Sequence, residues 1–272
     1  MLTGLCRWSA PLAMLVLAAC ASISTTQSGA IGVNRTQYMS SLVPTAQLEQ
    51  EASKQYGDTL AKAKSQGLLD KDAAQLNRVK AISQKLIAQT AVFRPDAAKW
   101  AWEVHMITAD DINAWCMPGG KIAVYTGLLN QIKPTDAELA AVLGHEIAHA
   151  LREHARERVS QQMATNIGLS VLSIATGSQQ AADLGSRLSE VMFTLPNSRT
   201  HESEADLMGL ELAARAGYDP RAAVTLWQKM GAAQSGQASP EFLSTHPSAS
   251  TRIADLRQAS ERVLPLYEQA RR

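Results

Sequence analysis

His145-Glu146-Ile147-Ala148-His149 stands in the middle of a long segment, Thr135–Val159, whose apolar residues recur with helical spacing. Because an α-helix has about 3.6 residues per turn, His145 and His149 project from one face, one above the other. Two neutral imidazoles in this arrangement can hold a zinc ion, and Glu146 is then placed to take a proton from a water molecule on the metal. The five residues alone also fit a buried helix that happens to carry two histidines, so the rest of the chain must decide.

A catalytic zinc needs three protein ligands and one open position. The extended motif HExxHxxGxxH is absent, because Leu151–Arg158 supplies neither its glycine nor its third histidine. The alternative ligand is a glutamate from a later helix, and Ser198–Gly217 predicts such a helix. Its Glu202 can bind the metal while Asp206, four residues on, accepts the second N–H of a ligating histidine. Taken alone, these acidic residues also fit a solvated helix N-terminus, where negative charge is favourable.

Composition and charge exclude some classes of protein. The chain has 272 residues and a formal net charge of +1, with no block of Lys or Arg, so nothing indicates a nucleic-acid partner. Few aromatic residues and abundant Ala, Leu and Gln favour a helical protein with an ample core. No repeat of solenoid length is visible.

The N-terminus has the form of an export signal. The apolar run Pro11–Ala19 is too short to span a membrane as a mature helix and is typical of a secretory signal peptide. Leu17–Cys20 resembles the bacterial lipobox, in which the cysteine is lipidated and becomes the mature N-terminus; an ordinary signal peptide with an incidental cysteine is the alternative. Ala21 after Cys20 resembles lipoproteins that are sent on to the outer membrane.

Three segments are therefore expected: a signal peptide at 1–19, a lipidated N-terminus and flexible tether at 20–45, and one domain at 46–272. The tether is inferred from a stretch rich in Ser, Thr, Gln and Gly. Cys116 is then left without a disulfide partner, and we expect it to be a small buried hydrophobe.

The remaining pattern predicts an α+β fold that is predominantly helical. Alternation in Lys99–Ile107 and Lys121–Thr126 predicts two strands of a small antiparallel sheet, the second entered through Pro118-Gly119-Gly120. Gly144 allows another backbone to come close to the histidine helix, and Glu153 and His154 are expected in its solvated end. The expected helices are 46–65, a second that starts at Asp70 or Asp72 and runs to about Thr90, and then 135–159, 161–175, 198–217, 222–230, 249–259 and 263–271.

Four motifs in one order resemble the HtpX-like and CAAX-prenyl-protease-like family of zinc metallopeptidases. HEIAH is followed by the family's SRxxExxAD pattern in Ser198–Asp206. Upstream, Asn113–Leu129 is similar to the family's NAFxxPGGxIxVYTGLL, and downstream Ser244–Ser248 with Arg252 is similar to THPSxxxRI. The lipobox, and the lack of the hydrophobic spans that anchor many relatives, resemble the soluble periplasmic lipoprotein branch, which is LoiP-like.

The resemblance implies a zincin-like metallopeptidase domain whose active-site helix carries HExxH. It implies one zinc ion per chain, held by His145, His149 and Glu202, with Asp206 orienting a ligating histidine and Glu146 as general base. Glu204 lies about 200° round the helix from Glu202 and does not compete as a ligand. The family's edge strand above the zinc, which would pair with an extended substrate, falls on Lys121, Ile122, Ala123, Val124 and Tyr125.

Pairing through the main chain suits unfolded clients of mixed sequence, whereas a folded partner would not present such a strand. We therefore expect an outer-membrane, periplasm-facing endopeptidase that acts on unfolded or misfolded envelope proteins, with outer-membrane assembly or protease proteins as further partners. His246 can donate a hydrogen bond to the oxyanion, occupy the fourth zinc position and keep the enzyme latent, or be an ordinary loop histidine. The competing hypotheses are a non-catalytic lipoprotein chaperone or assembly factor, and a zinc amidase or endopeptidase of cell-wall peptides.

Overall fold

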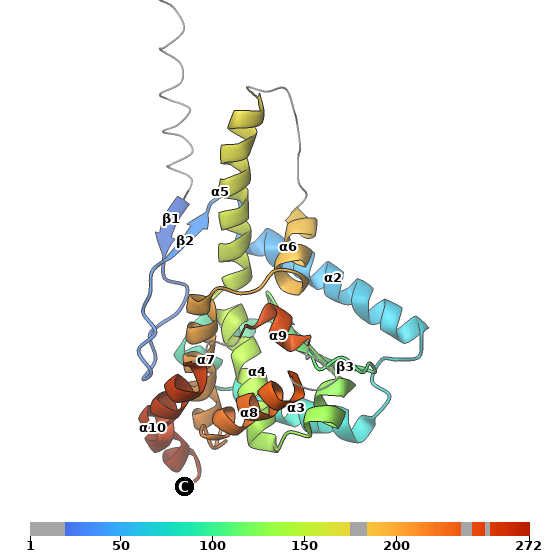
Figure 1. Ribbon diagram of the computed structural model, residues 1–272, viewed down its shortest axis with the longest axis vertical. Coiled ribbons are helices and arrows are strands. Elements are labelled where there is room, and N and C mark those ends of the chain that lie inside the picture. The colour runs from blue at the N-terminus through green and yellow to red at the C-terminus, as the bar shows by residue number, and fades with distance from the viewer. Residues whose placement is uncertain (1–19, 175–183, 235–240, 248–250) are drawn as a thin grey trace, which may run out of the picture.

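The computed structural model describes residues 20–174, 184–234, 241–247 and 251–272. Two helices packed against each other occupy its centre: α4 (Asp136–Leu151) and α7 (Arg199–Arg215) (Figure 1). The predicted capping box starts α4, since the N–H of Glu138 donates to Oγ1 of Thr135 and the N–H of Thr135 donates to the Glu138 carboxylate. The remainder of α4 is buried almost throughout, which makes it the core helix around which the other elements assemble.

The backbones of α4 and α7 meet at a pair of glycines. A Cβ atom on Gly209 would lie 2.8 Å from the backbone nitrogen of His145, and one on Gly144 would lie 2.9 Å from the carbonyl oxygen of Gly209. No side chain fits at either position, so the two helices approach as closely as their main chains allow. The expected close approach at Gly144 is confirmed, and it fixes how the two helices present their side chains to one another.

A three-stranded sheet lies beside this helix pair, formed by β3 (Glu103–Ile107), β4 (Ala114–Met117) and β5 (Lys121–Tyr125). The strand order is β3-β5-β4, in which β5 pairs in parallel with β3 and antiparallel with β4. The fold class is confirmed, but the sheet is mixed rather than antiparallel. The expectation that Lys121–Tyr125 is an edge strand is wrong, because β4 folds back on β5 through the turn at Gly119 and Gly120 and takes its second side.

The expected flexible tether is folded over most of its length. β1 (Cys20–Ile23) and β2 (Gln37–Ser40) form an antiparallel pair in which Cys20 lies opposite Ser40. Ile31, Val33 and Met39 are buried, because the segment is anchored in the domain by polar groups that sequence composition does not reveal. One of them is the buried carboxylate of Glu211 on α7, which accepts the N–H of Ile31 at 2.7 Å.

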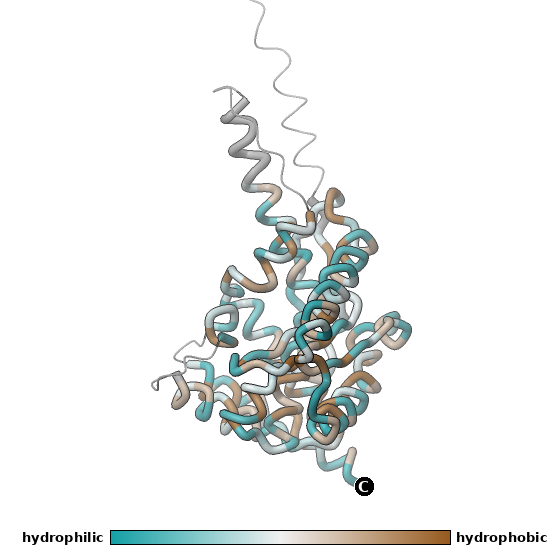
Figure 2. Tube along the Cα trace, turned by 90° about the vertical axis from the view of Figure 1, so that its right-hand side faces the viewer, coloured by the Kyte–Doolittle hydropathy of each residue, from teal (hydrophilic) through white to brown (hydrophobic). Residues whose placement is uncertain are grey.

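The other elements surround the centre. In chain order they are α2 (Thr45–Ser65), α3 (Ala73–Ile87), the short helices η1 (Thr90–Val92), η2 (Pro95–Lys99) and η3 (Leu128–Ile132), α5 (His154–Ile174), α6 (Leu184–Phe193), α8 (Ala222–Gln234), α9 (Phe242–Thr245) and α10 (Arg252–Ala270). Teal and brown alternate along the helices in Figure 2, as expected for helices with one buried face. Among the described residues, no helix is both long and apolar enough to cross a membrane.

Several helix boundaries differ from the expected ones, and two of the differences change how helices are joined. The predicted segment Thr135–Val159 is broken after Leu151, because Glu153 adopts a positive φ of 51° and α5 starts anew at His154. The two predicted C-terminal helices are one, α10, which continues through Pro265. The predicted signal peptide at 1–19 and Ser248 lie outside the described residues.

Candidate metal centre and active site

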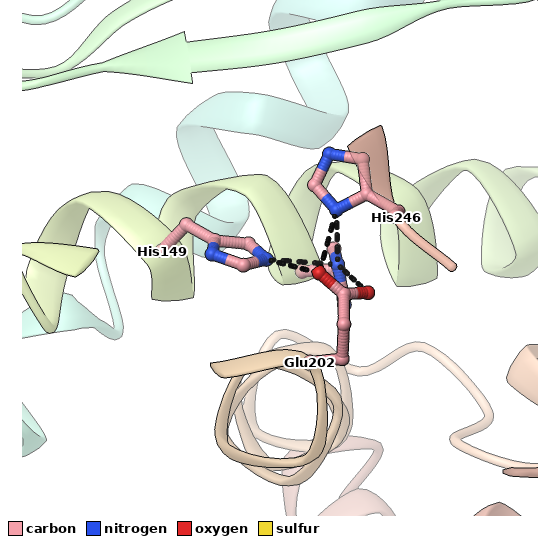
Figure 3. A group of neighbouring side chains, drawn as sticks. His149, Glu202 and His246 are labelled. Carbon is pink, nitrogen blue, oxygen red and sulfur yellow. Dashed lines mark hydrogen bonds and ion pairs between the residues drawn. The ribbon is translucent and has the colours of Figure 1, made fainter. Parts of the chain in front are cut away.

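Four side chains from three separate parts of the chain converge between α4 and α7. They are His145 and His149 on α4, Glu202 on α7, and His246 directly after α9. Each of the four is buried, and their donor atoms all lie within 4.8 Å of one another. In Figure 3, His149 reaches in from α4, Glu202 comes from α7 below, and His246 descends from the opposite side.

The spacing of the donor atoms fits a single metal ion. Nε2 of His145 lies 3.1 Å from Nε2 of His149 and 3.2 Å from Nδ1 of His246. Oε1 of Glu202 lies 3.4 Å from Nε2 of His149 and 3.0 Å from Nδ1 of His246. Ligands on a tetrahedral zinc ion with bonds of about 2.0–2.1 Å are roughly 3.3 Å apart. The four side chains therefore have the donor types and the separations of a zinc site.

The charges of the cluster also call for a cation. Nδ1 of His145 lies 3.0 Å from Oδ1 of Asp206, a carboxylate that only accepts, so this nitrogen carries a proton and Nε2 faces the other donors. Burial alone would lower the pKa of His145, but the carboxylates of Glu202 and Asp206 outweigh this effect and raise the pKa to about 9. A buried imidazole of raised basicity beside two carboxylates marks a position where a positive charge, carried by a proton or by a metal ion, is stabilised.

Arg252 on α10 fixes the acidic side of the site. Its Nη1 donates to Oε2 of Glu202 at 3.0 Å and its Nη2 donates to Oδ1 of Asp206 at 2.7 Å. The guanidinium lies 3.3 Å from the centre of the Trp227 ring, which holds it in place. The sequence indicated Arg252 only as part of a motif; the structure shows that it positions both carboxylates at once.

Glu146 lies next to His145 on α4 and lines a cavity beside the cluster. Its carboxylate accepts the backbone N–H of Cys116, while Oε1 has no hydrogen-bond partner among the described residues and lies 3.4 Å from Nε2 of His246. Burial raises the pKa of Glu146 above its ordinary value. The site therefore holds an available carboxylate oxygen of raised basicity, which is what a general base requires.

His246 is held firmly in the cluster. Its ring stacks on Phe242 at a centroid distance of 4.3 Å, and its N–H donates to the carbonyl of the same residue. The preceding carbonyl, that of Thr245, accepts the backbone N–H of Asn197, which ties α9 to the start of α7. His246 is therefore neither exposed nor an ordinary loop residue.

The cavity beside the cluster has a volume of about 340 Å³ and runs along β4. The strand β4 pairs only with β5 among the strands of the described residues, so its other side borders this cavity. Trp115 and Phe193 form an edge-to-face pair in the wall, with ring centroids 5.5 Å apart. A cavity lined by both polar and apolar side chains, bordered by the side of β4 that does not face β5, thus reaches Glu146 and His149.

A second buried polar cluster lies behind His149. The expectation that Glu153 and His154 are solvated is wrong, because the break between α4 and α5 at Glu153 turns His154 inward and leaves it only 1% exposed. Glu204 points away from the metal cluster, as expected, and binds Arg152 and His154. The end of α4, the helices α5 and α7, and the N-terminal segment supply this cluster. Its residues are Arg35, Gln37, Arg152, His154, Glu157, His201 and Glu204.

The fold and the site define a metallopeptidase of the HExxH class, and comparison with known families agrees. The chain belongs to peptidase family M48, whose model matches residues 73–260. This confirms the resemblance to the HtpX-like and CAAX-prenyl-protease-like zinc metallopeptidases, and with it zinc as the metal for which the site is built.

Named relatives come from mitochondria and from bacteria. The chain is 42% identical to the mitochondrial metalloendopeptidase OMA1 of Arabidopsis thaliana over 62% of its length, and 38% identical to the OMA1 metalloendopeptidase of Bos taurus over 79%. It is 30% identical to the beta-barrel assembly-enhancing protease of Escherichia coli over 66% of its length. The matched parts span 34%, 42% and 38% of those three relatives, so less than half of each is represented here.

Proposed function

We propose that this protein is a zinc-dependent endopeptidase in which His145, His149 and Glu202 hold the ion. The observation that carries the proposal is the convergence of three histidine nitrogens and a carboxylate at tetrahedral spacing, next to a buried carboxylate that has a free oxygen. Asp206 holds the ring of His145 through Nδ1, and Arg252 holds Glu202, so both ligands are preoriented.

Zinc, when bound, supplies a water molecule of lowered pKa and polarises the scissile carbonyl. Glu146, whose Oε1 has no hydrogen-bond partner among the described residues, would take a proton from the attacking water and deliver it to the leaving amine. The raised pKa that burial gives Glu146 suits both halves of this task, because the group must first accept the proton and then release it.

His246 completes the set of four donors, and this geometry favours the latent form among the three roles weighed for it. Nδ1 of His246 lies 3.2 Å from Nε2 of His145, so His246 would be the fourth ligand of a zinc ion held by the other three side chains and would take the position that water needs. The enzyme would become active when the segment of α9 and His246 moves aside. A His246→Ala variant is then expected to cleave faster than the wild type, whereas a role for His246 at the oxyanion predicts slower cleavage.

The substrate is proposed to be an extended polypeptide that pairs with β4. Pairing with β4 replaces the expected pairing with Lys121–Tyr125, because that segment is the central strand of the sheet. A substrate strand beside β4 would lie along the cavity that reaches Glu146. Main-chain pairing reads little sequence, which suits unfolded or misfolded proteins. The lipobox at Leu17–Cys20 and the bacterial relative that enhances β-barrel assembly support a lipid-anchored protease of the outer membrane, facing the periplasm.

The test is hydrolysis of unfolded casein by the purified wild type and a Glu146→Gln variant, with zinc content measured on both. Glu146→Gln should retain about one zinc per chain and lose roughly 10²–10⁴-fold in turnover, because it keeps the shape of the side chain but cannot accept the proton. Equal and measurable activity in the two proteins would indicate a contaminating protease and refute the mechanism, whereas two inactive proteins would require the same comparison in the His246→Ala background. If His246→Ala also binds zinc without cleaving, the non-catalytic chaperone or assembly hypothesis replaces the enzyme.

A further inference from the structure

A second histidine stands directly behind the ligand His149. Nδ1 of His154 lies 2.9 Å from Nδ1 of His149, and Nε2 of His154 lies 3.0 Å from Oε2 of Glu204. All three side chains are buried, with 8%, 1% and 6% exposure for His149, His154 and Glu204. A continuous line of hydrogen bonds therefore runs from the metal cluster into the polar cluster behind it.

The direction of each hydrogen bond follows from the chemistry of the groups. If Nε2 of His149 binds zinc, its Nδ1 must carry the proton and donate it to His154. Nδ1 of His154 is then the acceptor, so its own proton resides on Nε2, which donates to the carboxylate of Glu204. Every donor in the line meets an acceptor, and no second arrangement of protons satisfies both ends.

The far end of the line is fixed by two arginines. Nη2 of Arg152 donates to Oε1 of Glu204 at 2.9 Å, and Nε of Arg35 donates to the same oxygen at 2.8 Å. The ring of His154 stacks on that of His201 at a centroid distance of 4.4 Å. These contacts fix both the position and the ring orientation of His154. A side chain that sets the orientation of its neighbour must itself be fixed in this way.

The two ligands on α4 are supported in different ways. Nδ1 of His145 meets a carboxylate directly, at Asp206. Nδ1 of His149 contacts no carboxylate among the described residues and meets His154 instead. We propose that His154 is a positioning residue for His149: with Glu204 behind it, it fixes the tautomer and the ring orientation that zinc binding requires. This inference rests on the proposed zinc site.

The test compares zinc affinity among variants of the purified protein, by competition with a chromogenic chelator. His154→Asn places an amide oxygen near the former Nδ1 and keeps an acceptor for His149, whereas His154→Gln places its amide near the former Nε2 and leaves His149 without one. Zinc binding by His154→Gln should be about 10- to 100-fold weaker than that of the wild type, and binding by His154→Asn should stay within about threefold. A His105→Gln variant, remote from the cluster, controls for loss of a histidine.

Circular dichroism of the zinc-free proteins sets a temperature at which every variant is folded, so that affinity is compared between native states. Equal affinities of His154→Asn and His154→Gln, whether both normal or both weakened, would overturn the proposal, because the acceptor at Nδ1 would then have no role. A wild type that binds no zinc would instead refute the zinc site itself. A wild type that binds zinc, with both variants unchanged, would refute the positioning role alone.

Discussion

Replacing Gly209 by alanine tests whether the contact between α4 and α7 sets the geometry of the metal site. The added methyl group would lie 2.8 Å from the backbone nitrogen of His145 and 2.9 Å from the carbonyl carbon of Gly144. Neither neighbour is a side chain that can turn away, so the helices themselves must separate. Because ordinary contacts between such atoms are about 3.5–4.0 Å, the separation is roughly 0.7–1.2 Å.

Two effects follow from this displacement. Forcing extra volume into a closely packed contact costs about 1–3 kcal/mol, which lowers the melting temperature of a chain of this size by roughly 2–12 °C. The same displacement moves Glu202 on α7 away from His145 on α4. Metal sites tolerate deviations of only about 0.2 Å in ligand distance, so zinc affinity should fall along with stability.

The assay is thermal unfolding together with chelator competition for zinc, on Gly209→Ala and on Gly57→Ala as the matched control. Gly57 lies within α2, where an added Cβ meets nothing within 4 Å, so alanine there should stabilise the protein by about 0.5–1 kcal/mol and leave zinc affinity unchanged. If Gly209→Ala melts with the wild type and binds zinc equally well, the argument from close helix contact is refuted.

Two further predictions concern buried ionisable groups. Burial raises the pKa of Glu204, but hydrogen bonds from His154, Arg35 and Arg152 lower it further, to about 2. The carboxylate therefore stabilises the folded protein fully above its ordinary pKa of about 4.3, and this stabilisation is lost as the pH falls towards 2. Urea unfolding should therefore show Arg35→Gln less stable than the wild type by about 1–3 kcal/mol at pH 7 and by clearly less at pH 3; a constant difference would contradict this. Burial raises the pKa of the Cys116 thiol, which makes the thiol less reactive in the folded protein. In a variant that lacks Cys6 and Cys20, alkylation of Cys116 at pH 8 should be on the order of 100-fold or more slower in the folded protein than in urea. Comparable rates would show that β4 is exposed.

The features that sequence predicted best are those encoded locally. The capping box at Thr135 and Glu138 and the one-turn spacing of His145 and His149 depend only on helix geometry, and the structure has both. Asp206 was placed by the same argument and lies at Nδ1 of His145.

The features that sequence missed depend on contacts between distant segments. Strand order is one such feature, because the sequence pattern of Lys121–Tyr125 is the same for an edge strand and for a central strand. The strand β4 was missed because its four residues are all buried and show no alternation of buried and exposed positions. The helix break at Glu153 is another, since no glycine or proline marks it and the apolar spacing runs on through it. His154 consequently looked like a charged helix end although it is buried behind a ligand.

The hairpin of β1 and β2 has a consequence for where the proposed protease can act. A flexible linker over residues 20–45 would have a root-mean-square end-to-end distance of about 25–30 Å, and the distance between the domain and its anchor would vary accordingly. Instead, Cys20 is paired with Ser40, and Arg35 between them is bound to Glu157 and Glu204 inside the domain. With a lipid on Cys20, the cleft would therefore be held at nearly fixed height above the bilayer, and the choice of clients would depend on how close to the membrane surface they unfold.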